Sequence, residues 1–299
     1  MKAWALRAGE WLLAMLVRGL YLVMRGMGPR LGPAIGAAVA RGIGPLTPTQ
    51  RIVLGNLRLA FPERDEAWLR ATAGEAWDNL GRTACEYVHL SAITAGTTAD
   101  RLGPRLESDA ETEARFQELR AEARPVLVFA AHLANWELPA VVAHAIDQNA
   151  AILYRTPNNR FIAADITAMR EPIMGRLIPA GIAAPIRMAE ALDGGLNLGM
   201  LIDQRFGRGP LVPFFGRPVA ANPFIARLAG RFDAPVYGMR AIRLPHGRFR
   251  IVLEGPFALP RDGSGRVDVI QATALLNQII EGWVREYPGQ WLWMHRRWR

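Results

Sequence analysis

Residues 126–140, "VLVFAAHLANWELPA", place a short apolar run directly before His132 and Glu137. A run of this kind, bounded by polar residues, is typical of a buried strand in a parallel sheet. We expect the chain to turn at His132 and to enter a helix near Asn135. The stretch is therefore read as one strand, turn and helix unit of an α/β fold.

Similar runs recur farther along the chain, most of them separated by helical or polar stretches, at residues 150–154, 196–202, 236–242 and 249–253. This alternation predicts an α/β fold with a mixed, largely parallel central sheet flanked by helices. Ligands of such sheets bind beyond the carboxyl ends of the strands. His132, Arg155 and the triplet at 203–205 all follow strand ends, so we expect them to share one rim.

Composition and charge narrow the classes of partner. The 299 residues are 51% hydrophobic, which is enough for a sizeable core. The net charge of +9 favours partners that carry phosphate or an anionic membrane surface. Cys85 is the only cysteine, so an intrachain disulfide or a cysteine zinc cluster is excluded, and we expect no metal. No nucleic-acid-binding motif occurs, so nucleic acid is not an expected partner.

The N-terminus predicts a membrane-associated helix. Residues 11–24 are apolar except for Arg18 and Gly19, and basic residues flank them. Such a helix is about 21 Å long, against a hydrocarbon core of roughly 30 Å, and its flanks nearly close the gap. We expect an uncleaved anchor over residues 1–30, either spanning the bilayer or lying in its interface. A buried helix and a cleaved signal sequence are the alternatives.

The rest of the chain is expected to be one domain over residues 31–299, with a helical part at 31–105 and the α/β core at 106–299. The Gly/Pro-interrupted stretch that follows the anchor suits a membrane-proximal connection. A helical pattern then runs from about residue 49 to residue 89, with a break at Pro62.

His132 and Glu137 are five residues apart, which puts them roughly 140° apart on one continuous helix. With His132 in the turn and Glu137 in the first helical turn, the carboxylate folds back towards the imidazole. There it fixes the tautomer and stabilises the imidazolium, so that His132 serves as a general base. Alternatively, His132 is a strand-end histidine and Glu137 a favourable acid at a helix N-terminus. Spacing alone leaves both interpretations open.

Further polar residues follow the strand ends and supply guanidinium forks and amide donors suited to a phosphate or a developing oxyanion. The predicted substrate-binding residues are Arg155, Asn158, Asn159, Asp203, Gln204 and Arg205.

Five motifs in order resemble the bacterial lipid A biosynthesis acyltransferases of the lauroyl/myristoyl type, within the wider lysophospholipid acyltransferase-like group. They are H-x4-E at His132 and Glu137, "YRTPNN" at 154–159, "DQR" at 203–205, "VPFFGRP" at 212–218 and "QWLWMHRRW" at 290–298. Upstream, "RIVLGNLRLAFPE" at 51–63 and "WDNLGRTACEYVHL" at 77–90 continue the likeness, which covers nearly the whole chain. Many members of the wider group have Asp where this chain has Glu137.

The resemblance implies an acyltransferase that moves a fatty acyl chain from acyl carrier protein to a hydroxyl of a lipid A precursor, at the cytoplasmic face of the bacterial inner membrane. It implies His132 as general base and Glu137 as its partner. No cofactor is implied beyond the phosphopantetheine thioester of the carrier. The alternative acceptor of the acyl chain is a lysophospholipid, an ornithine lipid or a glycolipid. The alternative class of protein is a non-catalytic membrane binder.

The C-terminal "WLWMHRRWR" at 291–299 also has two interpretations. Its tryptophans and arginines form an interfacial belt that meets anionic lipid or carrier protein. Alternatively, Trp291 and Trp293 pack into the core as a final strand and leave only the arginines at the surface.

Overall fold

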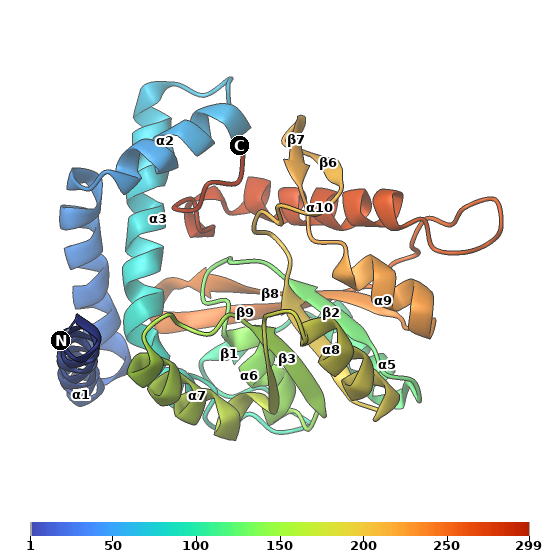
Figure 1. Cartoon of the computed structure of the whole chain (residues 1–299), viewed down its shortest axis with the longest axis horizontal. Helices are drawn as coiled ribbons and strands as arrows, with labels where there is room; N and C mark the ends of the chain where they lie inside the picture. The colour runs from blue at the N-terminus through green and yellow to red at the C-terminus, as the bar shows by residue number, and fades with distance from the viewer. Residues whose placement is uncertain (1, 299) are drawn as a thin grey trace.

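The computed structural model describes residues 2–298 and centres on a seven-stranded sheet of order β1-β9-β8-β2-β5-β3-β4 (Figure 1). The strands are β1 (Leu106–Glu107), β2 (Leu127–Ala130), β3 (Ala150–Tyr154), β4 (Arg176–Pro179), β5 (Asn197–Leu201), β8 (Val236–Leu244) and β9 (Arg248–Glu254). Neighbouring strands pair in parallel, except that β8 and β9 are antiparallel. The predicted mixed, largely parallel sheet is therefore confirmed.

All five strands predicted from the apolar runs are present, and their ends differ by at most two residues. The strands that the sequence did not reveal are the short edge strands β1 and β4 and the separate hairpin of β6 (Leu211–Phe214) and β7 (Arg217–Ala220). The hairpin turns at Phe215 and Gly216, which both have positive φ, as a tight two-residue hairpin turn requires.

Helices cover both faces of the sheet. The core on one face includes residues of α8 (Ala184–Asp193), α9 (Phe224–Phe232) and α10 (Val269–Glu286). The core on the other face includes residues of α5 (Ala110–Ala121), α6 (Leu138–Ala145) and α7 (Arg160–Met174). Successive residues of a strand point to opposite faces, so Leu127 and Phe129 pack under α8–α10, whereas Val128 faces the α6 side.

The remaining helices form an arm at one end of the sheet (Figure 1). They are α1 (Lys2–Ile43), α2 (Thr49–Ala60), α3 (Glu66–Glu86) and the short α4 (Leu90–Ile93). Helix α1 changes direction at Gly28, which has φ 76°. Beyond it the chain is helical again to Ile43, so the Gly/Pro-interrupted stretch is itself helical. Pro29 follows the change of direction, where a missing backbone N–H is tolerated.

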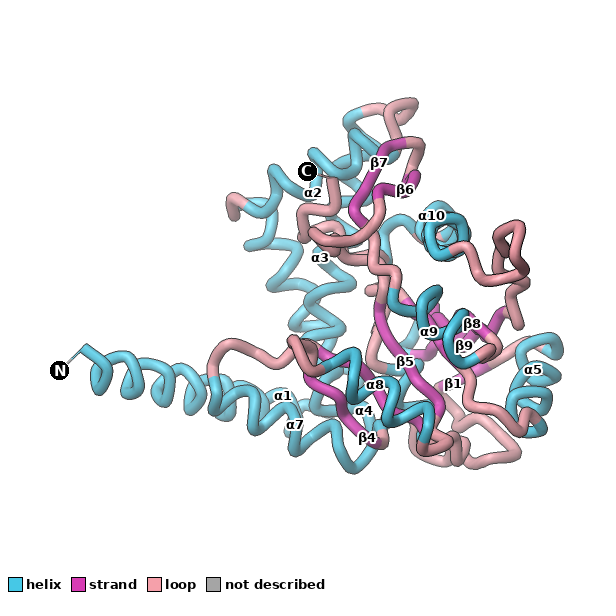
Figure 2. Tube along the Cα trace, turned by 45° about the vertical axis from the view of Figure 1, so that its right-hand side comes forward, coloured by secondary structure: helices cyan, strands magenta, loops and turns pink. Residues whose placement is uncertain are grey.

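The first half of α1 projects from the body (Figure 2). The helix over Arg7–Leu46, which includes most of α1, is the one helix of the described residues that is long and apolar enough to cross a membrane. Its exposed side chains include Leu12, Leu16 and Leu22, with Leu16 71% exposed. One side is nevertheless tied to the body, because Ala14 is fully buried and Arg18 pairs with Asp165 of α7 at 2.7 Å. By length, composition and exposure, α1 is a candidate membrane anchor.

The C-terminal segment packs into the core. Trp291 and Trp293 are fully buried and meet edge to face, with ring centroids 4.6 Å apart. Arg297, expected at the surface, is also fully buried, so that part of the expectation was wrong. Its guanidinium lies 5.0 Å above the Phe214 ring and donates a hydrogen bond to Asn277 at 2.5 Å.

Candidate active site

His132 lies in the turn that leaves β2, as expected. Ala134, two residues on, has a positive φ of 47°, and its carbonyl oxygen accepts a hydrogen bond from Thr83 of α3 at 2.9 Å. The C-terminal segment holds the same turn, because Leu292 donates its backbone N–H to the His132 carbonyl oxygen at 3.0 Å. Parts of the chain far apart in sequence thus fix the position of His132.

The partner of the imidazole is Asp203. Asp203 follows β5, the parallel neighbour of β2, and lies fully buried behind His132. Its Oδ1 is 2.7 Å from His132 Nδ1, and its Oδ2 accepts hydrogen bonds from the His132 backbone N–H and the Trp291 indole N–H, each at 2.8 Å. The carboxylate therefore receives three donors, one of them the ring.

Asp203 is held ionised. Burial raises the pKa of its carboxyl, but the attraction of the His132 ring and the hydrogen bonds from His132 outweigh burial and bring that pKa below its usual range. An ionised Asp203 only accepts hydrogen bonds, so the proton of a neutral His132 ring belongs on Nδ1. Nε2 then carries the lone pair of the ring, which accepts a hydrogen bond from Gln204 Nε2 at 3.3 Å.

Glu137 has a different partner from the one expected. It is the N-cap residue of α6, and its two carboxylate oxygens accept hydrogen bonds from Arg170 of α7 at 2.5 Å and 3.1 Å. No hydrogen bond joins Glu137 to His132 among residues 2–298. The expectation that Glu137 folds back to orient the ring was therefore wrong, because the side chain leaves the start of α6 towards α7.

Arg170 was missed at the sequence level. Burial lowers the pKa of its guanidinium, but the charge of Glu137 outweighs burial and holds that pKa above the usual value. The guanidinium also lies over two aromatic rings, 5.4 Å from the centroid of Tyr87 and 5.5 Å from that of Tyr154. A single arginine inside an apolar helix, "ITAMREP", was the only signal.

The predicted substrate-binding residues separate into two groups. Arg155, Gln204 and Arg205 line a cavity at the rim of the sheet. In the part of the chain that the structure describes, neither Asn158 nor Asn159 lines this cavity. The structure therefore does not bring them to the rim. Asn159 instead caps α7, accepting from the N–H of Phe161 at 2.9 Å, and donates to the Glu10 carbonyl at 2.8 Å. Asp203, buried behind His132, contacts the base instead of lining the cavity.

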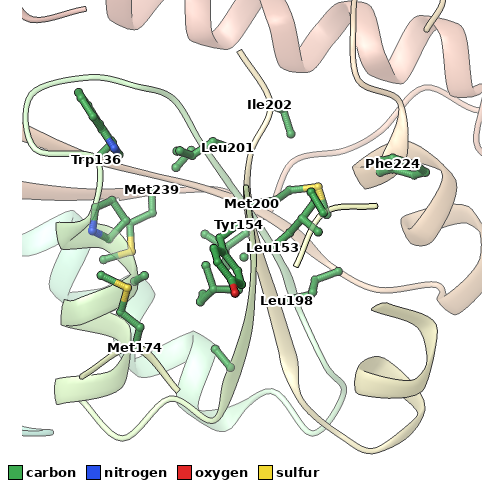
Figure 3. Close-up of a pocket in the computed structure, with 18 of the residues that line it drawn as sticks. Trp136, Leu153, Tyr154, Met174, Leu198, Met200, Leu201, Ile202, Phe224 and Met239 are labelled. Atoms are coloured by element: carbon green, nitrogen blue, oxygen red, sulfur yellow. The ribbon is translucent and has the colours of Figure 1, made fainter. Parts of the chain in front are cut away.

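The cavity has a volume of about 970 Å³ and is lined mostly by apolar side chains. Exposed residues at the rim, such as Gln204 and Arg205, line the cavity together with His132 and Arg170, and its lining includes side chains on both faces of the sheet. Figure 3 shows Met174 and Met239 on one side of the strands and Leu198 and Met200 on the other. No cluster of three or more metal-ligating side chains occurs in the part of the chain that the structure describes. The arrangement combines a histidine paired with a buried carboxylate and an apolar chamber large enough for a hydrocarbon chain.

Comparisons with known proteins match this chain over nearly its whole length. The family model described as bacterial lipid A biosynthesis acyltransferase matches residues 2–299. The chain is 25% identical over 308 residues to a lipid A biosynthesis palmitoleoyltransferase of Escherichia coli (strain K12), an alignment that covers 99% of this chain and 91% of the relative. It has the same identity and coverage with a lipid A biosynthesis acyltransferase of Shigella flexneri.

Proposed function

Since the chain belongs to the bacterial lipid A biosynthesis acyltransferase family, we propose that it moves a fatty acyl chain from acyl carrier protein to a hydroxyl of a lipid A precursor. The observation that carries the proposal is the His132–Asp203 pair, 2.7 Å apart, at the mouth of an apolar cavity of about 970 Å³. A base is needed to activate a hydroxyl, and an apolar chamber is needed to hold an acyl chain.

His132 acts as the general base. Its Nε2 takes the proton of the acceptor hydroxyl while the oxygen attacks the thioester carbonyl carbon. Asp203 stabilises the imidazolium that forms, without becoming protonated itself. The tetrahedral intermediate then collapses, the C–S bond breaks, and the thiolate of the carrier's phosphopantetheine arm accepts the proton from His132. Gln204, now 3.3 Å from Nε2, yields its place to the acceptor hydroxyl.

Arg170 supplies positive charge beside the reacting carbonyl. It lines the cavity together with His132 and is fixed by Glu137 and by the rings of Tyr87 and Tyr154. A charge that is already in position stabilises an oxyanion without reorganising during the reaction. In this account Glu137 serves catalysis through Arg170 and not through His132.

The substrates fit the charges of the rim. Arg155, Arg205 and Arg208 line the mouth of the cavity and suit the phosphates of a lipid A precursor or of the carrier's phosphopantetheine arm. The net charge of +9 suits an acidic carrier protein. No cofactor is needed beyond the phosphopantetheine thioester that delivers the acyl chain.

Helix α1 attaches the enzyme to the inner membrane, with the cavity on the cytoplasmic side. Apolar side chains of its first half are exposed, while Arg18 ties it to α7, the helix that carries Arg170. The anchor therefore keeps the rim of the cavity close to the bilayer from which a lipid acceptor arrives. Deletion of residues 1–26 is expected to release much of the protein from membranes.

The test is transfer by the purified enzyme from acyl-loaded carrier protein to a lipid A precursor, with the product identified by mass spectrometry. His132→Ala should lower turnover on the order of 10²–10⁴-fold. The matched control is His144→Ala, because His144 is exposed on α6 and does not line the cavity. Near-normal turnover by a folded His132→Ala enzyme contradicts the proposal. Transfer to a lysophospholipid but not to the lipid A precursor would assign the alternative acceptor.

A further inference from the structure

Part of the cavity lies between α6 and the middle strands of the sheet. Val128 of β2 and Ile152 of β3 both pair in register with Gly199 of β5. All three are only partly buried, although their strands lie in the middle of the sheet. Facing them, α6 contributes the small side chains of Ala140 and Ala143. Protein interiors are normally close-packed, so an open space against a central strand indicates a binding chamber.

The depth of the chamber follows from the strands. Gly199 is four residues before Asp203, and Val128 is four residues before His132, which places this level roughly 13 Å below the rim. Val126 and Asn197 are two residues deeper, roughly 20 Å below the rim. Because all of these residues line the same cavity, an extended hydrocarbon chain with its carbonyl at His132 passes Gly199 before it reaches Asn197.

The chamber ends at two amide side chains. Asn197 donates from Nδ2 to Gln148 Oε1 at 3.1 Å, and its own Oδ1 accepts the backbone N–H of Val126 at 2.9 Å. Leu119 and Ile146 line the same end. Beyond them lies a second cavity of about 290 Å³, which these four side chains also line together with charged residues such as Arg120 and Arg124. The amide pair thus separates the apolar chamber from a polar one.

We propose that the Gln148–Asn197 pair is the floor of an acyl-chain chamber, and that these two residues, with Gly199 above them, set the longest acyl chain that the enzyme transfers. The inference rests on the proposed function and deepens it. A methyl end pushed against the pair would cover amide groups without replacing their hydrogen bonds, which is unfavourable. The chain therefore stops at the pair.

Gly199 keeps the chamber open at mid-depth. A Cβ added at Gly199 would lie 2.8 Å from Cδ1 of Ile152, the far end of a flexible side chain. Alanine is therefore accommodated by a small movement of Ile152. Valine, which suits a strand, fills the chamber at this level and leaves no path to the floor.

The experiment measures kcat/KM of the full-length enzyme with carrier protein loaded with decanoyl, dodecanoyl, tetradecanoyl, hexadecanoyl or octadecanoyl chains. Gly199→Val is expected to change the ratio of decanoyl to hexadecanoyl transfer at least tenfold in favour of the short chain, and Gly199→Ala less. One methylene in an apolar pocket already discriminates by roughly 10–200-fold.

Gln148→Ala is expected to shift the optimum towards longer chains, because it joins the chamber to the second cavity. Gln148 is preferable to Asn197 as a target, since Asn197 also accepts the backbone N–H of Val126, just before β2. The Gln148→Ala variant also tests the proposal if Gly199→Val does not fold. Gln117→Ala, exposed on α5, is the matched control and should leave the profile unchanged.

The outcomes separate this inference from the proposed function. A wild-type enzyme that transfers no chain from any donor contradicts the proposed function. If the wild-type enzyme transfers acyl chains and the variants have the same chain-length profile, the proposed function stands and the assignment of the Gln148–Asn197 pair as the floor is wrong.

Discussion

Two buried carboxylates lie beside the turn that carries His132, and they make different contacts. Asp203 is 0% exposed and Glu137 is 6% exposed. The Asp203 carboxylate accepts hydrogen bonds from the His132 ring, the His132 backbone N–H and the Trp291 indole N–H. Among residues 2–298, the Glu137 carboxylate accepts hydrogen bonds only from the side chain of Arg170. The carboxylate nearer in sequence thus binds an arginine of the cavity, whereas the one that follows the neighbouring strand binds the His132 ring.

The difference shows how an α/β sheet assembles a site. β2 and β5 are parallel neighbours, so the residues just beyond their carboxyl ends meet, although 71 positions separate His132 from Asp203 in the chain. Glu137 lies at the start of α6 and points to α7. Adjacency in the sheet, and not proximity in sequence, decides the partner.

The largest effect is expected from Asp203→Asn, which keeps the volume and removes the charge. An amide at this position can donate to Nδ1, which favours the proton on Nε2 and leaves no lone pair for the acceptor hydroxyl. By comparison with the Ser-His-Asp triad, kcat should fall on the order of 10⁴-fold. Steady-state kinetics with saturating acyl donor measure the fall. A fall in kcat of less than about tenfold would contradict the role of Asp203 as the partner of His132.

Glu137→Gln should have a large effect on stability and a smaller one on turnover than Asp203→Asn. It leaves the guanidinium of Arg170 charged and mostly buried without its counter-ion, which typically costs about 3–5 kcal/mol. Thermal unfolding in detergent measures the loss. The matched double variant, Glu137→Gln with Arg170→Gln, should recover part of it because no charge is left unpaired. No recovery in the double variant would show that the two residues are not coupled.

Trp291→Phe comes next. It removes one donor to the ionised Asp203, a kind of hydrogen bond worth about 1.5–3 kcal/mol, and loosens the carboxylate that orients His132. We expect kcat to fall about tenfold, which corresponds to about 1.4 kcal/mol. Trp293→Phe is the control, since the Trp293 indole donates to the Pro288 carbonyl and not to Asp203. Equal losses of kcat in both variants would mean that the effect is one of packing.

The smallest effect concerns the pH dependence of stability. The pKa of Asp203 in the folded protein lies below its unfolded value of about 3.9. Its ionised form therefore stabilises the fold fully above that unfolded value, and the contribution is lost as the pH falls through the lower, folded-state pKa. The difference in Tm between the wild type and Asp203→Asn should shrink as the pH falls below about 4. A difference that stays the same as the pH falls from about 4 to about 2 would contradict the assignment.

The sequence predicted those parts of the fold whose signal is local. The five apolar runs became strands, and His132, Arg155 and Gln204 meet at one rim because they follow parallel strands. The partner of His132 was not predictable in this way, because it depends on strand order, which no local pattern contains. Arg170 was missed for a similar reason, since only the packing of α6 against α7 brings it to Glu137.

The contact between Asp203 and the His132 ring can be observed directly by ¹⁵N NMR of histidine-labelled protein, with the His132 signals assigned by their loss in His132→Gln. The chemical shifts of the two ring nitrogens report which one carries the proton. The contact predicts that the proton of the neutral ring lies on Nδ1 in the wild type and in Glu137→Gln, and that the tautomer changes in Asp203→Asn. A tautomer that changes in Glu137→Gln and stays the same in Asp203→Asn would contradict the assignment of Asp203 as the partner of the base.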